Sequence, residues 1–509
     1  MGAVLMVQGC ASSVGKSLIV TGLCRLFHRR GVRVAPFKAQ NLALNSFVTR
    51  EGHEIGRAQV VQAEAAGIEP TVDMNPILLK PEGDSGVQVV VMGKPLSKAE
   101  TRSYFEQRDE LSTIIGAALE RLRASYDLVL IEGAGSPAEI NLRERDLANM
   151  HVARLANAPV LLVGDIDRGG VFAHLYGTLA LLESGDRARV AGLLINKFRG
   201  DPSLIRSAIE WTEAETKLPV LGVLPYLPDL RLADEDSLSL EDRLDDRRAG
   251  AGELEIVVVR LPYLSNHDDF LSLEREPGVV LRYVESPADL GQPELVILPG
   301  TKNTRSDLGW LRESGWEAAL RQRAANGQYL LGICGGYQML GGAIEDPHGV
   351  EGEPGSVRGL ELLPVRTHFK TEKTTRQVSL LRSPAALSFL APATDNPRAL
   401  VGYEIHMGEP ILDEGTPPLF LHAERGAAEG VAQGSVAGTL LHGLFDNAEL
   451  RADLLRQLRS LRSLPEAGGS APTDSTTELD RLADMLEAHL DLARLELLLG
   501  ASWTPTTRG

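Results

Sequence analysis

Short apolar runs recur along the first half of the chain, and polar, helix-forming stretches separate them. Six runs are apolar throughout instead of alternating: AVLMVQG, VRVAPF, YDLVLIEGAG, APVLLVGDID, VAGLLINK and PVLGVLPY. A strand without alternation is covered on both faces, which is typical of a parallel sheet with helices on each side. The pattern therefore predicts a doubly wound α/β domain whose last strand ends near Tyr226.

A second series of apolar runs follows a polar break. The break, at 233–253, is dense in charged residues and ends in alanine and glycine, so we interpret it as a surface linker. The runs LEIVVVRLP, VVLRYVES, PELVILPG and YLLGIC then predict a second parallel sheet. We expect the fold class to be α/β, with doubly wound domains at 1–232 and 254–447 and a helical tail at 448–509.

The tail has two parts. The segment SLPEAGGSAPTDSTT, rich in small and turn-forming residues, predicts a flexible connection. Residues 478–499 carry apolar positions at helical spacing, which predicts a helix that packs back onto one of the domains.

Composition adds limits on function and location. The 509 residues are 43% apolar and only 5% aromatic, which favours a globular protein with more than one core. The formal net charge is −17 without a long basic run, which argues against nucleic-acid and membrane partners. No apolar stretch is long enough to span a bilayer, and no basic region precedes the apolar N-terminus, so we expect a cytoplasmic protein. Three cysteines fit a reducing compartment.

A candidate phosphate loop, GCASSVGKS, lies between the first predicted strand and a predicted helix. Backbone N–H groups in such a loop cradle phosphates, and its lysine neutralises their charge. The candidate ATP contacts are Gly9, Ser13, Gly15, Lys16 and Ser17, and the Ser17 hydroxyl is also a candidate Mg²⁺ ligand. Five residues, instead of the usual four, separate Gly9 from Gly15, so a plain Gly/Ser-rich turn is the alternative.

Other polar residues follow the predicted strands of the first domain. Glu132 is the candidate second Mg²⁺ ligand, because the carboxyl ends of parallel strands meet at the ligand crevice. Lys38 is a candidate phosphate contact and Asn196 a candidate contact to adenine. Asp165 and Asp167 are weaker metal candidates. A capping glutamate, a solvated lysine and a turn asparagine are the corresponding structural alternatives.

The second domain contains a cysteine between glycines, in GICGG, where a predicted strand turns into a helix. This arrangement at Cys334 is typical of a nucleophile elbow, since small neighbours permit the bend and the helix N-terminus favours the thiolate. His442, in GTLLHGLF, is the candidate base. Gly300, Thr301 and Gly335 are candidate oxyanion donors. The alternative for a lone cysteine is a small buried hydrophobic residue.

These motifs resemble known families. The second domain resembles the class I glutamine amidotransferases, which hydrolyse glutamine at a cysteine elbow and release ammonia. The resemblance places the three oxyanion candidates in a glutamine pocket. Many members have a glutamate two residues after the histidine; here Leu444 stands there, as in the corrinoid-amidating subgroup, so what orients His442 stays open. The first domain resembles the dethiobiotin-synthetase-like ATPases, which share the wider phosphate loop and the EGAG strand end.

The domain order resembles the corrinoid amidases, and the motifs resemble the cobyric acid synthase family among them. The motifs are IEGAGSPAEINL, DIDRGGVFA, INKFRGD, LPGTKNT, GICGGYQMLG and GYEIHMG, together with the stretch at 36–81. The resemblance implies ATP- and glutamine-dependent amidation of the b, d, e and g carboxylates of adenosylcobyrinic a,c-diamide through acyl phosphates. The product would be adenosylcobyric acid, in cobalamin biosynthesis. ATP and Mg²⁺ are the implied cofactors, and the implied partners are the small-molecule substrates.

Three alternatives remain at this point. The sister amidase that acts on the a and c carboxylates shares both domains, but QNLALNSFVT and EIGRAQ favour the cobyric acid synthase family. An ATPase switch of the ParA/MinD type would share the phosphate loop without needing Cys334 or His442. A binding module with a degenerate amidotransferase domain would lack the nucleophile. If the second domain is an amidotransferase, His406 is the next candidate base after His442.

Overall fold

The computed structural model describes residues 1–82, 86–96, 107–227, 230, 232, 247–384, 389, 398–464 and 475–500. Most of the predicted linker at 233–253 lies outside these residues, as does most of the SLPEAGGSAPTDSTT segment. Among the residues that are described, no helix is long and apolar enough to cross a membrane.

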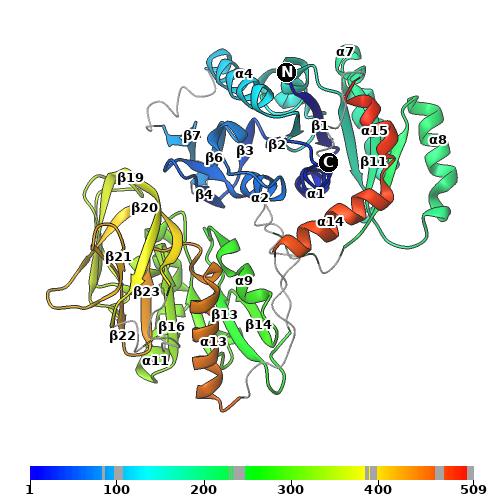
Figure 1. The fold of residues 1–509 in the computed structure, drawn as a ribbon. Helices are drawn as coiled ribbons and strands as arrows, with labels where there is room; N and C mark the ends of the chain where they lie inside the picture. Colours follow the sequence, from blue (N-terminus) through cyan, green and yellow to red (C-terminus); the bar gives the residue numbers. More distant parts are fainter. Residues whose placement is uncertain are drawn as a thin grey trace.

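The first domain is built on a six-stranded parallel sheet with the order β12-β11-β10-β1-β9-β2 (Figure 1). Each strand coincides with one of the six apolar runs, because both faces of the sheet are covered. Five of the strands are largely buried, and β12, at the edge of the sheet, is half-buried. The strands are β1 (Ala3–Gly9), β2 (Val34–Phe37), β9 (Leu128–Glu132), β10 (Val160–Asp165), β11 (Val190–Phe198) and β12 (Val220–Pro225).

Helices pack on both faces of this sheet, as a doubly wound fold requires. One core cluster joins the sheet to α4, α5 and α6, and the other joins it to α1. The helices of the domain are α1 (Lys16–Arg29), α2 (Arg57–Ala65), α4 (Arg108–Ser125), α5 (Met150–Ala156), α6 (Val171–Leu181), α7 (Ser184–Arg187) and α8 (Arg206–Thr216), with short 3₁₀ segments at Val72–Met74, Ile140–Arg145 and Pro202–Ile205.

Two small sheets extend the first domain between β2 and α4. They were not apparent in the hydrophobic pattern, because their strands are only two to six residues long. The strands are β3 (Gln40–Leu42), β6 (Ile77–Glu82), β7 (Gly86–Val91) and β8 (Lys94–Pro95) in one sheet, and β4 (Ser46–Val48) and β5 (Glu54–Gly56) in the other. Strand β4 contacts the second domain at β19 and β20.

The second domain has a mixed sheet. Its parallel half consists of β13 (Leu254–Val259), β14 (Val279–Val284), β15 (Leu295–Leu298), β16 (Tyr329–Ile333) and β23 (Val436–Thr439). The other half, mostly antiparallel, was not predicted. It consists of β17 (Ala343–Asp346), β18 (Gly355–Arg358), β19 (Val365–Arg382), β20 (Leu400–Leu412), β21 (Pro418–His422) and β22 (Ala428–Gln433).

The helical segments of the second domain are mostly short. They are the 3₁₀ turns η6 (His267–Phe270), Pro287–Asp289 and η9 (Leu444–Asp446), and the helices α9 (Leu271–Glu274), α10 (Thr304–Glu313), α11 (Trp316–Ala325) and α12 (Gly335–Leu340).

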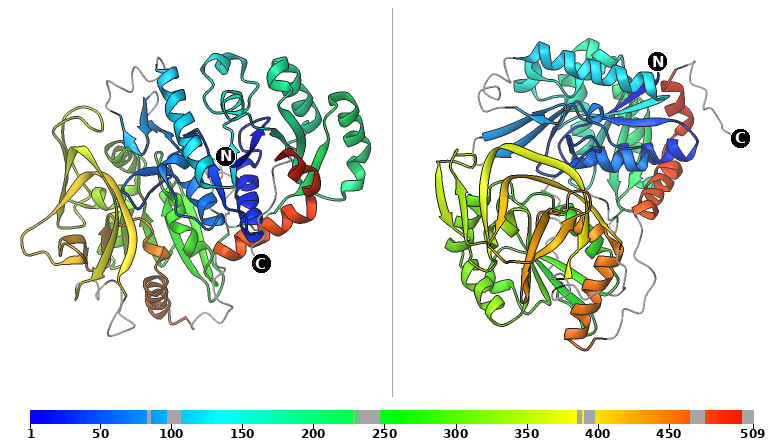
Figure 2. Two further views of the ribbon diagram at one scale, coloured as in Figure 1. Left: turned by 45° about the horizontal axis from the view of Figure 1, so that its top comes forward. Right: turned by 60° about the vertical axis from the view of Figure 1, so that its left-hand side comes forward.

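The predicted tail is divided between the two domains. Helix α13 (Ala448–Leu461) packs into the core of the second domain. Helices α14 (Ser475–His489) and α15 (Leu492–Leu498) return to the first domain and lie beside α1 (Figures 1 and 2). Leu482 and Leu486 enter the core there, and Arg25 pairs with Asp480 at 2.8 Å. The last described helices therefore belong to the domain that begins at the N-terminus and do not form an independent unit.

Candidate functional site

Cys334 lies at the turn between β16 and α12. Its φ of 49° and ψ of −109° are a conformation that L-residues rarely adopt, and strain of this kind is typical of functional turns. The turn is also tightly packed, because a Cβ on Gly336 would lie 1.8 Å from the carbonyl oxygen of Leu298 on β15. Only glycine fits at this position, and the thiol is held where strand and helix meet.

His442 follows β23 and is 1% exposed. Burial alone would lower its pKa, but the charges of Asp269 and Cys334 and hydrogen bonds to both raise the pKa to about 10. The imidazole therefore carries a proton at neutral pH. It lies between a thiol and a carboxylate, which is the arrangement that a cysteine nucleophile with a histidine partner requires.

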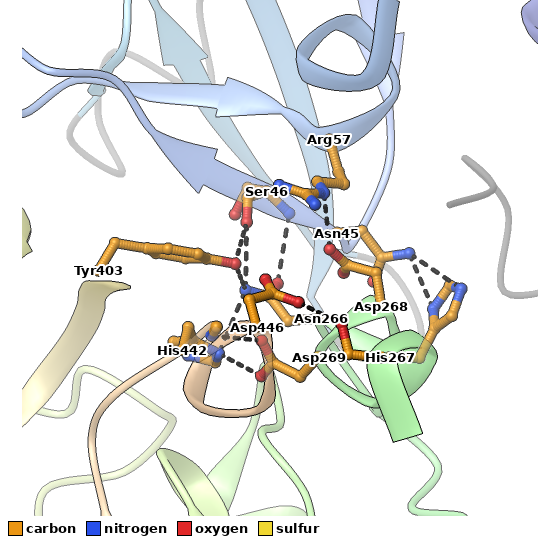
Figure 3. A network of polar contacts seen from close by, with 12 residues as sticks. Asn45, Ser46, Arg57, Asn266, His267, Asp268, Asp269, Tyr403, His442 and Asp446 are labelled. Atoms are coloured by element: carbon orange, nitrogen blue, oxygen red, sulfur yellow. Dashed lines mark hydrogen bonds and ion pairs between the residues drawn. The ribbon is translucent and has the colours of Figure 1, made fainter. Parts of the chain in front are cut away.

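Asp269, which the sequence analysis did not identify, contacts the far side of the imidazole. His442 Nδ1 donates to Asp269 Oδ2 at 2.7 Å, and the backbone N–H of Gly443 donates to Asp269 Oδ1 at 2.9 Å (Figure 3). Leu444, where many amidotransferases have a glutamate, is buried and apolar. The one signal in the sequence was NHDD, a polar run at 266–269 between apolar stretches.

Tyr403 and Asn266 surround the same ring. The Tyr403 ring stacks on His442, with centroids 5.2 Å apart and an angle of 17° between the planes. Tyr403 and His442 also exchange backbone hydrogen bonds as an isolated antiparallel bridge. Asn266 Nδ2 lies 3.4 Å from His442 Nδ1 and donates to the Tyr403 hydroxyl at 2.9 Å. The histidine is therefore held on one face by Tyr403 and at Nδ1 by Asp269 and Asn266.

The three oxyanion candidates lie around the same turn. A Cβ on Gly300 would be 3.2 Å from His442 Cε1, and one on Gly335 would be 2.6 Å from Thr301 Cγ2. The loop after β15 therefore contacts both the histidine and the start of α12. Their part in holding an oxyanion stays a prediction.

His406, the second candidate base, is engaged elsewhere. Its Nδ1 contacts the Gly408 carbonyl oxygen at 2.8 Å, and its Nε2 lies 3.7 Å from Glu404. Cys334 Sγ lies 3.7 Å from the carbonyl oxygen of Ile405, the residue before His406.

The phosphate loop joins β1 to α1. Gly15 has a φ of 96°, and a Cβ there would lie 2.2 Å from Asn196 Nδ2, so glycine is required. Gly9 ends β1, where a Cβ would lie 3.1 Å from Lys16 Nζ. Lys16 donates to the carbonyl oxygen of Ala11 at 3.1 Å, which folds its ammonium group over the loop.

Asn196 supports this loop from β11. Its amide nitrogen donates to the Val14 carbonyl oxygen at 2.8 Å. Ser13, with a φ of 55°, accepts at its carbonyl oxygen from Lys197 Nζ at 2.8 Å. The amide of Asn196 is therefore used at the loop, and its contact to adenine stays a prediction.

Glu132 is fully buried beside the loop. Its Oε1 accepts from Ser17 Oγ at 2.7 Å and from Lys38 Nζ at 2.8 Å, and its Oε2 accepts from Gln62 Nε2 at 2.6 Å. Burial would raise the pKa of Glu132, but Lys38 and the hydrogen bonds of Ser17 and Gln62 lower it, so the carboxylate is charged. A charged carboxylate beside a hydroxyl is a donor set that suits Mg²⁺ when phosphates complete the shell.

Asp165 and Asp167 pair with cations instead. Lys197 contacts Asp165 at 2.9 Å, and Arg199 contacts Asp167 at 2.7 Å. Within the described part of the chain, no three or more His, Cys, Asp or Glu side chains form a group that could hold a metal. Any magnesium site there would therefore depend on phosphate oxygens as well as on Ser17 and Glu132.

A cavity of about 980 Å³ opens beside the phosphate loop. Several basic residues line it although the chain as a whole is strongly acidic. They include Lys16, Lys38, Arg145, Arg168 and Lys197. A cavity of this volume accommodates ligands larger than most single metabolites, and its basic lining favours anionic ones.

Comparisons with known proteins agree on both domains. Residues 5–240 match the CobQ/CobB/MinD/ParA nucleotide binding domain, and residues 255–450 match the CobB/CobQ-like glutamine amidotransferase domain. The chain is 56% identical to a cobyric acid synthase of Sorangium cellulosum, over 97% of this chain and 98% of that protein. It is 52% identical to one of Pelotomaculum thermopropionicum, over 98% and 97%, and 48% identical to one of Klebsiella pneumoniae, over 97% and 98%.

Proposed function

The chain belongs to the cobyric acid synthase family, and from this membership we propose how its two sites divide the work of forming an amide on a corrinoid. The protein is a glutamine-dependent amidating enzyme of cobalamin biosynthesis with a nucleotide-binding domain. One observation carries the division of work. A phosphate loop and a buried Cys–His pair lie in separate domains of one chain whose relatives match it end to end.

Cys334 and His442 release ammonia from glutamine. The sulfur attacks the side-chain carboxamide carbon, the carbonyl π electrons move to oxygen, and the tetrahedral centre collapses as the C–N bond breaks. His442, protonated at neutral pH, gives its proton to the leaving nitrogen, so that neutral ammonia departs and a thioester remains. Water then adds to the thioester while His442 takes one of its protons, and the tetrahedral centre collapses as the C–S bond breaks. Glutamic acid leaves and gives its proton to solvent, and the Cys334 sulfur is again beside a protonated His442. Gly300, Thr301 and Gly335 would stabilise the oxyanion.

The first domain activates the acceptor carboxylate. A carboxylate oxygen attacks the γ-phosphorus of ATP, the bond to the bridging oxygen breaks, and ADP leaves an acyl phosphate behind. Ammonia then attacks the acyl carbon, inorganic phosphate departs, and the nitrogen loses a proton to form the amide. Lys16 would neutralise charge on the transferred phosphoryl group, and Lys38 would lie close by. Ser17 and Glu132 would hold Mg²⁺, which when bound neutralises further phosphate charge.

The acceptor is adenosylcobyrinic a,c-diamide, and its b, d, e and g carboxylates are amidated to give adenosylcobyric acid. Such a substrate carries several negative charges. Arg145 and Arg168, exposed at the edge of the 980 Å³ cavity, suit carboxylates of this kind. We assign the acceptor to this outer part of the cavity and the nucleotide to the part beside the phosphate loop.

Mass spectrometry of the corrinoid tests the proposal. The a,c-diamide, incubated with ATP, Mg²⁺ and glutamine, should gain four amides, each lowering the mass by about 1 Da. Lys16→Ala should prevent amidation with either glutamine or ammonium as nitrogen source, because activation precedes both. Lys217→Ala, an exposed lysine of the same domain, is the matched control and should act as wild type. A wild-type protein that adds no amide to this acceptor would refute the assignment.

Oxygen-18 tests the acyl phosphate separately. If the carboxylate is phosphorylated, label placed in the acceptor carboxylate should appear in the released inorganic phosphate. Label in AMP would mean that the carboxylate is adenylated. Turnover with all label retained in the corrinoid would exclude both kinds of activation.

A further inference from the structure

The four residues Asn266 to Asp269 contact both domains at once. They follow the loop after β13 and form the start of η6, so they belong to the second domain by chain and by core packing. Asp269 bonds to His442 within the glutaminase site. Its neighbour Asp268 points to the first domain, where it forms an ion pair of 2.8 Å with Arg57 at the start of α2 (Figure 3).

The ion pair is well buried. The side chains of Arg57 and Asp268 are 15% and 4% exposed. Burial raises the pKa of Asp268 to about 6 even beside Arg57, so this carboxylate depends on the arginine for its charge. A pair of this kind costs much when one partner is removed, because the other is left buried and uncompensated.

Two further contacts cross the same boundary. Asn266 Nδ2 donates to the carbonyl oxygen of Ser46 at 3.1 Å, and the Tyr403 hydroxyl donates to the same oxygen at 3.1 Å. Ser46 begins β4 of the first domain. Asn266 and Tyr403 also contact the His442 ring, Asn266 near Nδ1 and Tyr403 on one face. Three side chains that contact the histidine ring are therefore tied to the first domain. Asn266 and Tyr403 bond to Ser46, and Asp269 is adjacent to Asp268, which pairs with Arg57.

We propose that Asp269 is the positioning residue of the glutaminase site, and that the first domain holds it in place through Arg57 and Ser46. The inference rests on the proposed glutaminase role of Cys334 and His442. Because Asp268 and Asp269 are consecutive in a single 3₁₀ turn, a displacement of one displaces the other. The Cys–His–Asp arrangement is complete only while the synthetase domain is docked, which ties ammonia release to the state of the domain that consumes it.

Asp269→Asn tests the positioning role. Glutaminase kcat should fall by about 100-fold to 10,000-fold, the range for losing part of a general acid–base system. Ammonium-dependent amidation should persist. Losing the carboxylate charge lowers the pKa of His442, so its proton is lost at lower pH and the basic limb of the glutaminase profile moves down. The other ionisable side chains around the ring are Cys334, Asp268, Asp446 and Arg57, and this variant replaces none of them. A rate loss without movement of the limb would mean only a structural role and would overturn this part.

Arg57→Gln tests the support from the first domain. Glutaminase kcat/KM should fall by about 10-fold, in the range of measured coupling effects, while ammonium-dependent amidation stays within about twofold of wild type. Asp268→Asn should have the same effect. The double variant should be no worse than either single one, since both remove the same pair. Arg121→Gln, which removes an exposed pair with Asp73, is the matched control and should change neither activity.

Tyr403→Phe provides a variant that keeps the ring stack and removes only the hydroxyl. It should lower glutaminase by several-fold and leave the thermal midpoint nearly unchanged. Wild-type glutaminase in both Arg57→Gln and Tyr403→Phe would overturn the inference while leaving the proposed function intact. Parallel loss of ammonium-dependent amidation in folded Arg57→Gln would overturn it as well, because the contact would then serve the synthetase site. Absence of glutaminase in the wild type would instead refute the proposed function.

Discussion

Two buried carboxylates, one in each domain, are paired with basic side chains at the candidate sites. Asp269 raises the pKa of His442, and Glu132 accepts from Lys38 Nζ at 2.8 Å beside the phosphate loop. Glu132 ends β9 and Asp269 lies in η6, and both are held by several hydrogen bonds, so neither side chain can turn away without leaving a buried charge unpaired. We therefore expect that a substitution in one of the two candidate sites impairs the activity of that site and leaves the activity of the other.

Cys334→Ala should abolish glutamine-dependent amidation and leave amidation with high ammonium at raised pH. The glutaminase rate should fall by at least about 1,000-fold, because the covalent route is lost. His442→Ala should show the same split. His489→Ala, at an exposed position on α14, is the control for removing an imidazole. Loss of both activities in a folded Cys334→Ala protein would contradict the assigned role.

Glu132→Gln should weaken synthesis and raise the Mg²⁺ concentration needed for half-maximal rate. The amide keeps the shape of the side chain but lacks the charge that attracts the cation and balances Lys38. Excess Mg²⁺ should restore part of the rate. The measurement is ammonium-dependent amidation against Mg²⁺ concentration, and an unchanged Mg²⁺ dependence would remove Glu132 from the metal site.

Residues with local motifs could be predicted from the sequence, and residues defined by distant contacts could not. Cys334 was predicted because its glycine neighbours reveal the turn, and Lys16 because the loop, strand and helix are consecutive. Asp269 lies 173 positions from His442 along the chain, in a four-residue 3₁₀ turn without periodicity. Arg57 likewise gives no sign, before the fold is known, that its partner lies in the other domain.

Strands and helices meet at the reacting groups through turns in which backbone packs directly on backbone. Helix α12 starts so close to β15 that Gly336 has no room for a side chain, and β23 lies so close to α12 that a Cβ on Gly438 would be 2.1 Å from the Tyr337 ring. Such contacts fix the direction in which the thiol projects from its strand. The precision of the site thus depends on glycines as well as on the reactive residues.

Gly336→Ala should destabilise the second domain by about 2–5 kcal/mol, since backbone of β15 cannot move aside without disrupting the sheet. Gly309, inside α10, is the matched control because a Cβ there meets nothing within 4 Å. Gly309→Ala should be neutral or stabilise by up to about 1 kcal/mol, through helix propensity. Thermal and denaturant unfolding measure both, and equal stability of the two variants would contradict the packing account.

The parallel strands were predicted because each is an unbroken apolar run, whereas the antiparallel half of the second domain carries no such signal. Strand β19 reads VRTHFKTEKTTRQVSLLR, with long polar stretches, because much of it faces solvent or the other domain. Its pairing with β20 extends from Val365 to Leu380. Strand β20 carries Tyr403, which stacks on the histidine. This contact therefore comes from an element that the hydrophobic pattern does not reveal.

Across the whole molecule, the first strand and the last described helices belong to one domain. Helices α14 and α15 cover α1, so the first domain closes only after the second has been made. The pairs of Arg25 with Asp480 and of Arg30 with Glu487 lie along this contact, but both are partly exposed, so most of its stability comes from buried leucines.

Leu486→Ala should lower the stability of the first domain by about 2–5 kcal/mol, the usual cost of a leucine truncated in a core. Leu486 is fully buried, whereas Leu497, on α15, is 78% exposed. Leu497→Ala is therefore the control and should change stability by no more than about 0.5 kcal/mol. Unfolding followed by nucleotide binding would report the first domain, and equal effects of the two changes would mean that α14 is not part of its core.

We propose that one chain transfers glutamine nitrogen to a corrinoid carboxylate activated elsewhere in the same molecule. Glutamine labelled with ¹⁵N in its amide, supplied with ATP, Mg²⁺, the a,c-diamide and excess unlabelled ammonium at neutral pH, tests this transfer. We expect four added amides that all carry ¹⁵N in the wild type, and no ¹⁵N-labelled amide in Lys16→Ala or in Cys334→Ala. The transfer would be refuted if the wild type formed unlabelled amides as fast as labelled ones. It would also be refuted if the label left as free ammonia and no amide formed.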